Sequence, residues 1–337
     1  MSYVLFFSGI LLASIGFGFV YLRSASLYGP YAIPNFRSLH QNVIPKGGGI
    51  AIAVSVLVGL LLFNLQNNLG MRHLMVFFIG GLVIAAAGYA DDWYDIRPRY
   101  RLAVQMLASL WICFWFGGLP VLDLGFMKIH LGLFGDILLI ISCLWFYNLY
   151  NFIDGIDGMA ASATIFISLT MVVILLMEKQ YDLAFILGLL AVANIGFILF
   201  NWPPARMFLG DSGTSFISYV VSAVAIASLW RNAVSIWVWL IVFGYYFSDT
   251  TLTTVIRALT VPRFYLPHRS HAYQNLARIW DSHLKTLLLV LAINLFWVLP
   301  FVWLVWKYPK HAAFAMVIAY APILLFCAKY GPRFEDK

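Results

Sequence analysis

Long apolar runs are the feature that most constrains what this chain can fold into. Several approach the roughly 20 consecutive apolar residues that a helix needs to cross a bilayer. A mean hydropathy of +0.88, with 63% hydrophobic residues, lies far outside the range of a soluble domain. We therefore expect an all-α polytopic membrane protein. The pattern predicts eleven spans, at residues 3–22, 47–64, 73–90, 102–117, 136–150, 159–177, 182–200, 212–230, 234–258, 284–306 and 311–328.

The chain is expected to form one integral-membrane domain over residues 1–337. We interpret residues 3–22 as a span and not as a signal peptide, because the run is too long, no Lys or Arg precedes it and no A-x-A pattern follows. Residues 119–135, LPVLDLGFMKIHLGLFG, alternate in polarity and predict a small external hairpin.

The distribution of charge predicts the orientation. A net charge of +7 could indicate a nucleic-acid partner, but the basic residues gather on one side of the predicted spans. With the N-terminus outside, the inner loops and the C-terminal tail carry 15 of the 21 Lys and Arg residues. This bias follows the positive-inside rule and predicts a cytoplasmic C-terminus. We expect contact with anionic membrane lipid and no nucleic-acid partner.

Most acidic residues fall on the same inner side. An ionised side chain at bilayer depth costs roughly 2.5–3.5 kcal/mol, so acids at the ends of spans need a reason. Asp95 and Asp281 are interpreted as solvated loop residues. The acids on the inner side include Asp91, Asp92, Asp95, Asp154, Asp157, Asp211, Asp249 and Asp281.

Three acidic clusters are harder to explain as ordinary loops. They are GYADDWYD (88–95), NFIDGIDGMA (151–160) and FLGDSGTSF (208–216). In the third cluster, Gly210 and Gly213 allow close backbone approach at the start of a predicted helix, whose first N–H groups can bind an anion. Asn201 lies ten residues before Asp211, at the inner end of the preceding span.

Carboxylates and Asn amides on one face suit a hard divalent cation. Mg²⁺ is the expected ion, with Mn²⁺ as the alternative, because Mg²⁺ usually shares its coordination shell with substrate phosphates. Basic side chains on the same side complete a site for a diphosphate. They are Arg99, Arg101, Arg206, Arg263, His268, Arg269 and His271. Such a site could bring a water-soluble phosphorylated substrate to one embedded in the bilayer.

Two other classes of protein fit this pattern less well. A transporter or lipid flippase would place ionisable residues near the bilayer midplane, facing a pathway. A non-catalytic scaffold would have no reason to keep Asn, Gly and Asp together in three loops.

Asp249 and Arg257, eight residues apart, are interpreted as bracing one helix where it leaves the bilayer. Five histidines are interpreted as loop residues: His40, His73, His130, His283 and His311.

With these motifs assembled, the chain resembles the polyprenyl-phosphate N-acetylhexosamine-1-phosphate transferases of glycosyltransferase family 4. This superfamily includes WecA-type initiators of bacterial surface glycans and the MraY-type enzyme of peptidoglycan synthesis. The motifs are IPKGGGI (44–50), ADDWYDIRPRYRL (90–102), NLYNFIDGIDG (148–158), FNWPPARMFLGDSG (200–213), and FSDTTLTTVIR followed by HRSH (247–271). The resemblance implies transfer of a sugar-1-phosphate from a UDP-sugar to undecaprenyl phosphate, with release of UMP, at the cytoplasmic face of the bacterial inner membrane.

The resemblance also assigns roles to residues. Asp91, Asp92, Asp154 and Asp157 match the catalytic acids, and Asp91 and Asp92 match the pair tied to the lipid phosphate. Asp211 matches the metal-ligand aspartate, and Asn151 the position that shares the metal in some members. The positions assigned to substrate binding are Lys46, Arg101, Asn201, Phe208, His268, Arg269 and His271, with Asn201 and Phe208 at the nucleotide pocket. Arg101 stands where relatives often carry Lys, which keeps the charge but changes its geometry.

One motif departs from the family pattern. WecA-type relatives read H-x-H-H in the large loop, whereas this chain reads HRSHAYQ, with Tyr273 and Gln274 where His would be expected. Similar loops occur in WbpL-like members, which initiate O-antigen with N-acetylfucosamine or N-acetylquinovosamine. We therefore expect a 6-deoxy N-acetylated amino sugar as donor, with N-acetylglucosamine as the alternative.

The expected mechanism is direct in-line displacement by a lipid-phosphate oxygen, and a two-step path through an aspartyl intermediate is the rival. The lipid phosphate is already largely dianionic at neutral pH, so it needs little help from a base. Asp91 or Asp92 could act as that base, position the lipid or support the metal. Spans that contain Gly and Ala could pack into a homodimer, but nothing in the sequence selects a dimer face.

Overall fold

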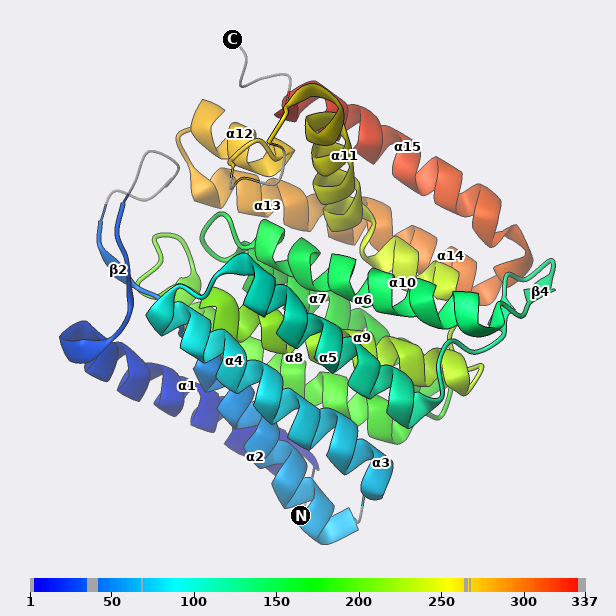
Figure 1. Cartoon of the computed structure of the whole chain (residues 1–337), viewed down its shortest axis with the longest axis horizontal. Coiled ribbons are helices and arrows are strands. Elements are labelled where there is room, and N and C mark those ends of the chain that lie inside the picture. Colours follow the sequence, from blue (N-terminus) through cyan, green and yellow to red (C-terminus); the bar gives the residue numbers. More distant parts are fainter. Residues whose placement is uncertain (1–2, 35–41, 68, 264–265, 267, 333–337) are drawn as a thin grey trace.

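The computed structural model describes residues 3–34, 42–67, 69–263, 266 and 268–332, and it is predominantly helical (Figure 1). The first part of the chain forms α1 (Tyr3–Tyr28), β1 (Tyr31–Ala32), β2 (Ile44–Pro45), α2 (Gly49–Asn67), α3 (Met71–His73), α4 (Gly81–Tyr94), α5 (Pro98–Phe116), β3 (Leu122–Asp123), β4 (Lys128–Ile129) and α6 (Gly132–Ile153). The second part forms α7 (Met159–Met177), α8 (Tyr181–Asn201), α9 (Gly210–Trp230), α10 (Ile236–Val242), α11 (Gly244–Thr260), α12 (Ala272–Ile279), α13 (His283–Ile293), α14 (Leu299–Lys307) and α15 (Ala312–Tyr330). Short π-helical segments, Leu74–Gly80 and Asn294–Val298, join α3 to α4 and α13 to α14.

Helices α7, α8 and α9 form the centre of the bundle (Figure 1). They are the most deeply buried of the apolar helices, and α8 packs against α1, α2, α7 and α9. Their buried residues lie on all sides of each helix, as expected for helices surrounded by other helices. One connected hydrophobic cluster runs from Phe6 in α1 to Cys327 in α15, so the described elements share a single core.

Nine of the eleven predicted spans are confirmed as helices long and apolar enough to cross a membrane, within the residues that the structure describes. They are Tyr3–Ala25, Gly49–Gln66, Met71–Tyr94, Gly132–Ile153, Met159–Met177, Tyr181–Asn201, Gly210–Trp230, His283–Lys307 and Pro309–Tyr330.

Two predicted spans differ from the structure. The predicted span 102–117 lies within α5, but Arg99, Arg101 and Gln105 make this helix less apolar than the nine. The predicted continuous span 234–258 is wrong, because the helix breaks at Phe243 into the short α10 and the more polar α11. Figure 1 shows α11 leaving α10 at a steep angle and lying beside α15.

The loops at the two ends of the helices are also structured. The hairpin predicted in 119–135 is confirmed, with β3 and β4 pairing antiparallel. At the opposite end, β1 pairs antiparallel with β2, and α12 lies within the large loop 259–283; the sequence indicated neither. The predicted inner loops therefore meet at one end of the bundle, although parts of 23–46 and of the tail 329–337 lie outside the described residues.

Helix α9 approaches its neighbours very closely, because glycine lies at the crossing points. A Cβ on Gly88 of α4 would collide with the backbone of Asp211 and Ser212, and one on Gly49 of α2 would collide with the backbone of Gly213. A backbone cannot move aside as a flexible side chain can, so larger residues at these crossings would displace the start of α9.

Replacement of Gly88 by Ala should therefore lower the thermal stability of the purified protein. We expect a cost of about 1–3 kcal/mol from overpacking, despite the better helix propensity of Ala. The matched control is Gly16→Ala in α1, where an added Cβ would meet nothing within 4 Å. Thermal unfolding in detergent should show a lower Tm for Gly88→Ala only; equal Tm values for the two variants would contradict the close crossing.

Candidate active site

The glycine-rich loop after β2 lies against the segment that leads into α9. The N–H of Gly48 donates to the carbonyl of Phe208 at 3.0 Å, and that of Gly49 to the carbonyl of Leu209 at 2.8 Å. Gly47 has a φ of 84°, a left-handed conformation that favours glycine. These bonds place Lys46 and Phe208, two of the expected substrate-binding residues, on the wall of one cavity.

Asp92, at the end of α4, holds the first turn of α9. Its Oδ1 accepts the backbone N–H of Asp211 at 2.9 Å, and its Oδ2 accepts that of Ser212 at 3.0 Å. Asp92 is buried, and the free N–H groups of a helix N-terminus are a favourable partner for a buried carboxylate. Both oxygens are therefore committed to positioning α9.

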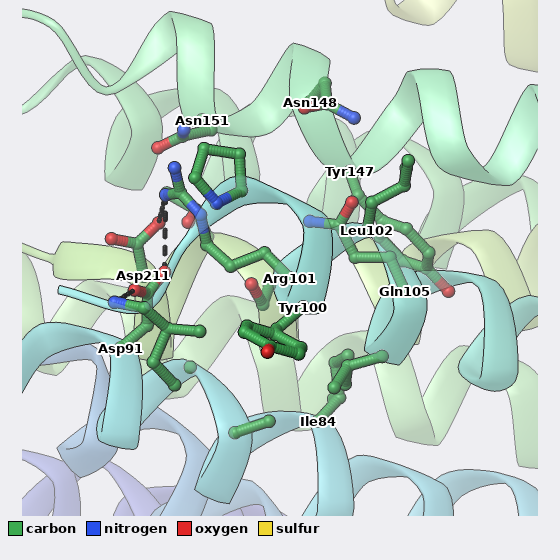
Figure 2. A pocket seen from close by; sticks show the side chains of 17 residues that line it. Ile84, Asp91, Tyr100, Arg101, Leu102, Gln105, Tyr147, Asn148, Asn151 and Asp211 are labelled. Atoms are coloured by element: carbon green, nitrogen blue, oxygen red, sulfur yellow. Dashed lines mark hydrogen bonds and ion pairs between the residues drawn. The ribbon is translucent and has the colours of Figure 1, made fainter. Parts of the chain in front are cut away.

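Arg101, from the first turn of α5, lies between two carboxylates. Its Nη1 is 3.3 Å from Oδ2 of Asp91 and 3.7 Å from Oδ1 of Asp211 (Figure 2). Oδ1 of Asp91 also accepts the N–H of Ile96 at 2.7 Å, which fixes this side chain. The arginine thus brings Asp91 and Asp211 together, which the sequence predicted only as clusters on one face.

The end of α6 supplies Asn151 and Asp154. Asn151, in the last turn of α6, is exposed on the cavity wall, and Asp154 follows the helix. Burial within the protein raises the pKa of Asp154, and the nearby carboxylates of Asp211, Asp92 and Asp157 raise it further. A negative charge on Asp154 is therefore costly here unless a cation lies nearby.

Asp157 and Asn201 connect the loop between α6 and α7 to the loop between α8 and α9. Oδ2 of Asp157 accepts the N–H of Ala205 at 3.0 Å and lies 3.2 Å from Nδ1 of His283. Asn201 accepts the N–H of Gly158 at 3.0 Å through Oδ1 and donates to the carbonyl of Met207 at 2.9 Å through Nδ2. Both side chains line the cavity and also hold its shape.

The large loop is held by α11. Asp249 accepts the N–H groups of Ala272 and Tyr273 at 2.9 and 3.2 Å, which stabilises the start of α12, and Arg257 donates to Oγ of Ser270 at 3.0 Å. Both side chains thus link α11 to this loop, and Asp249 also accepts the Oγ1 hydroxyl of Thr253 on its own helix at 3.3 Å.

Residues 268–274 contribute to the site in a different way from the prediction. The hydroxyl of Tyr273 donates to the carbonyl of Phe152, and Gln274 lines the cavity. Among the described residues that line the two cavities, His268, Arg269 and His271 do not occur. Burial lowers the pKa of His268 to about 3, with His271 and Arg257 adding to the effect, so His268 is neutral at physiological pH.

Two cavities meet at Asn151 and Asp211, which line both. The polar cavity, of about 290 Å³, is lined by Ala32, Lys46, Asp92, Asn151, Asp154, Gly155, Ile156, Asp157, Asn201, Phe208, Gly210, Asp211, Gln274 and His283. The second cavity, of about 160 Å³, lies between α4, α5, α6 and α9, with Arg101 at the junction and Gln105 and Tyr147 deeper inside (Figure 2).

The junction suits a hard cation that takes few protein ligands. In the described part of the chain, no three His, Cys, Asp or Glu side chains gather as a metal site. The carboxylate of Asp211 and the amide of Asn151 supply oxygen donors, and Mg²⁺ usually completes its shell with water and substrate phosphates. The donor chemistry at the junction therefore fits Mg²⁺.

His283 lines the polar cavity, which the sequence did not indicate. It was interpreted as a loop residue, but it is the first residue of α13 and its ring faces Asp157. A single histidine next to an apolar run belongs to no recognisable motif. The contact of His283 with Asp157 forms only when the chain folds, because the two residues are far apart in the sequence. Gln105 and Tyr147 line the second cavity, but each is a single residue within a helical sequence and belongs to no motif.

Comparison with known proteins shows where the chain is similar to others. The family model described as "Glycosyl transferase family 4" matches residues 74–229. The chain is 27% identical over 280 residues to a Bacillus subtilis protein named "Probable undecaprenyl-phosphate N-acetylglucosaminyl 1-phosphate transferase", covering 81% of this chain and 76% of the relative. It is 32% identical over 198 residues to the phospho-N-acetylmuramoyl-pentapeptide-transferase of Streptococcus pneumoniae, covering 54% of this chain and 59% of the relative.

Removal of the charge at position 154 should stabilise the protein. Because the folded protein raises the pKa of Asp154, ionisation of this side chain lowers the stability of the folded state. The loss of stability begins as the pH rises above the ordinary Asp pKa of about 4, and it levels off above the folded-state pKa. In chelating buffer, Asp154→Asn should raise Tm clearly near pH ~8 and less near pH ~5. The control is Asp281→Asn on an exposed loop, which should change Tm little. A lower Tm for Asp154→Asn at both pH values would contradict this interpretation.

Proposed function

Because the chain belongs to glycosyl transferase family 4, in the superfamily of WecA- and MraY-type enzymes, we propose that it transfers a sugar-1-phosphate from a UDP-sugar to undecaprenyl phosphate and releases UMP. The observation that carries the proposal is the junction of two cavities at Asn151 and Asp211. Two substrates held in adjoining cavities would meet there. The names of the Bacillus and streptococcal relatives, both phospho-sugar transferases, support the reaction class.

The polar cavity is the proposed donor site and the second cavity the proposed site of the lipid phosphate. Lys46 lines the first, and Arg101 lies where the second meets it, so each cavity has a cation for a phosphate. The cavities lie at the end of the bundle that the basic loops predict to be cytoplasmic. The ionisable side chains thus gather at one end of the helices, which argues against the transporter interpretation.

In the proposed step, an oxygen of the lipid phosphate attacks the sugar-side phosphorus of the donor. A new P–O bond forms, the bond from that phosphorus to the bridging oxygen breaks, and UMP leaves with the bridging oxygen. Such transfer needs mainly positioning and charge stabilisation. Mg²⁺ held by Asp211 and Asn151, or Mn²⁺ in its place, would neutralise charge on the diphosphate.

Asp91 and Asp92 are adjacent in the sequence but make different hydrogen bonds. Both oxygens of Asp92 accept backbone N–H groups, which supports a positioning role. Oδ2 of Asp91 is 3.3 Å from Arg101 and accepts no hydrogen bond from the described residues, so Asp91 is the better placed to help the lipid phosphate. A trapped phospho-enzyme would favour the two-step rival over direct displacement.

For the donor we propose a 6-deoxy N-acetylated amino sugar, as used to start O-antigen synthesis. Gln274, one of the two positions at which HRSHAYQ departs from the family pattern, lines the polar cavity. The hydroxyl of Tyr273 holds the backbone beside it. The name of the Bacillus relative supports N-acetylglucosamine as the second candidate.

The first test is UMP release by the purified protein with undecaprenyl phosphate and Mg²⁺. UDP-N-acetylfucosamine or UDP-N-acetylquinovosamine should yield UMP that depends on lipid and metal, and Asp211→Ala should lower the rate at least about 100-fold, as expected for loss of charge stabilisation. UMP from UDP-N-acetylglucosamine alone would keep the reaction class and refute the donor assignment. No UMP from any donor with folded protein would refute the proposed function.

A second test uses the charge at position 101. Arg101→Lys keeps a cation near Asp91 and Asp211 and should retain activity within about tenfold, whereas Arg101→Gln should lose about 100-fold or more. Arg99→Gln, whose guanidinium contacts the exposed ring of Tyr100, is the matched control. Steady-state rates with varied lipid concentration should show the larger effect on the lipid KM; full activity in Arg101→Gln would contradict the assignment.

A further inference from the structure

His283 links the C-terminal part of the chain to the polar cavity. It lies beyond residues 74–229, which the family model matches, and it lines the cavity with its side chain 19% exposed. Its Nδ1 is 3.2 Å from Oδ2 of Asp157. A histidine placed at a cavity wall by a carboxylate is a candidate for ligand binding, because one ring nitrogen is fixed while the other stays available.

Two groups of Asp157 lie beside Nδ1 of the ring. Nδ1 accepts the backbone N–H of Asp157 at 3.4 Å and lies 3.2 Å from its Oδ2. These contacts occupy Nδ1 and leave Nε2 for a ligand. Oδ2 also accepts the N–H of Ala205 at 3.0 Å, which holds the carboxylate in place.

Helix α13, which carries His283, is capped at its start and packs against Gly158 beside the cavity. Oγ of Ser282 accepts the N–H of Lys285 at 3.2 Å and so caps α13. A Cβ on Gly158 would lie 3.0 Å from Leu287, so the first turns of α13 pack closely on this glycine. The ring therefore has a defined position beside residues 155–158, whereas a histidine in a loose loop would not.

His283 lies away from the point where the two cavities meet. Asn151 and Asp211 line both cavities, but His283 and Asn201 line only the polar one. If the reacting phosphorus lies at the junction, the wall formed by Asp157, Asn201 and His283 faces a more distant part of the donor. Its backbone and side-chain groups offer hydrogen bonds to a heterocycle or a ribose.

We propose that His283 binds the nucleoside part of the UDP-sugar, with Nε2 forming a hydrogen bond with the uracil or a ribose hydroxyl, and that Asp157 positions the ring. This inference depends on the proposed function for the identity of the donor. It makes Asp157 a positioning residue that acts through His283.

The test is equilibrium binding of UDP, which has no sugar, to the full-length protein with Mg²⁺. His283→Asn can place a side-chain amide beside Asp157, where Nδ1 lies, but lacks Nε2, and we expect about 5- to 10-fold weaker binding, the effect of one hydrogen bond. His283→Gln can place its amide near the position of Nε2 and should bind more tightly than His283→Asn. His130→Asn, at the exposed β3–β4 hairpin, should bind as the wild type.

Binding of UDP by His283→Asn equal to the wild type would overturn the inference. Weaker binding of the UDP-sugar with unchanged binding of UDP would also overturn it, because the contact would then be to the sugar. Equal losses in His283→Asn and His283→Gln with a matching fall in Tm would show a purely structural role.

Carbethoxylation of the wild-type protein tests the contact without a variant. UDP should slow modification of His283, followed by mass spectrometry, and leave His130 unchanged; no protection would overturn the inference. The two proposals fail separately. Wild-type protein that releases no UMP from any donor refutes the function, whereas UMP release without any effect at His283 refutes only this inference.

Discussion

The bond between Asp92 and the start of α9 is the interaction on which the rest of the site depends. One buried carboxylate accepts the N–H groups of Asp211 and Ser212, which lie 119 and 120 residues away in the sequence. It fixes the backbone of Asp211, one of the two residues that line both cavities. Gly88, one turn earlier on α4, lets the helices approach closely enough for this bond. The unpaired N–H groups of α9 in turn offset part of the cost of burying the charge.

A second aspartate holds the start of a helix in the large loop 259–283. Asp249 of α11 accepts the first N–H groups of α12, as Asp92 does for α9. The break between α10 and α11 is what lets α11 lie close to this loop. Asn275 then donates to the carbonyls of Tyr330 and Gly331 at the end of α15. Helix α12, which carries Gln274 at the cavity, is thus held in place by α11 and α15.

The sequence predicts the apolar helices and the convergence of the acids, because both depend on local composition. Span lengths, the β3–β4 hairpin and the clusters around Asp91, Asp154 and Asp211 follow from patterns within a few residues. The division of roles does not. Whether Asp92 binds a ligand or caps a helix depends on a backbone N–H from a distant segment. The break at Phe243 and the contact of His283 with Asp157 likewise depend on packing that no local pattern records.

The charges that line the two cavities show why the site would need a cation. Five aspartates line them, at positions 91, 92, 154, 157 and 211, against Lys46 and Arg101 among the described residues. Asp92 and Asp157 are satisfied by backbone N–H groups, and the raised pKa of Asp154 favours its neutral form. The carboxylate of Asp211 lies at the junction, with Nη1 of Arg101 3.7 Å from its Oδ1. Two phosphorylated substrates would add further negative charge at that point. A divalent ion on Asp211 and Asn151 would then bind best when a phosphate is present, because protein and substrate would each supply part of its shell.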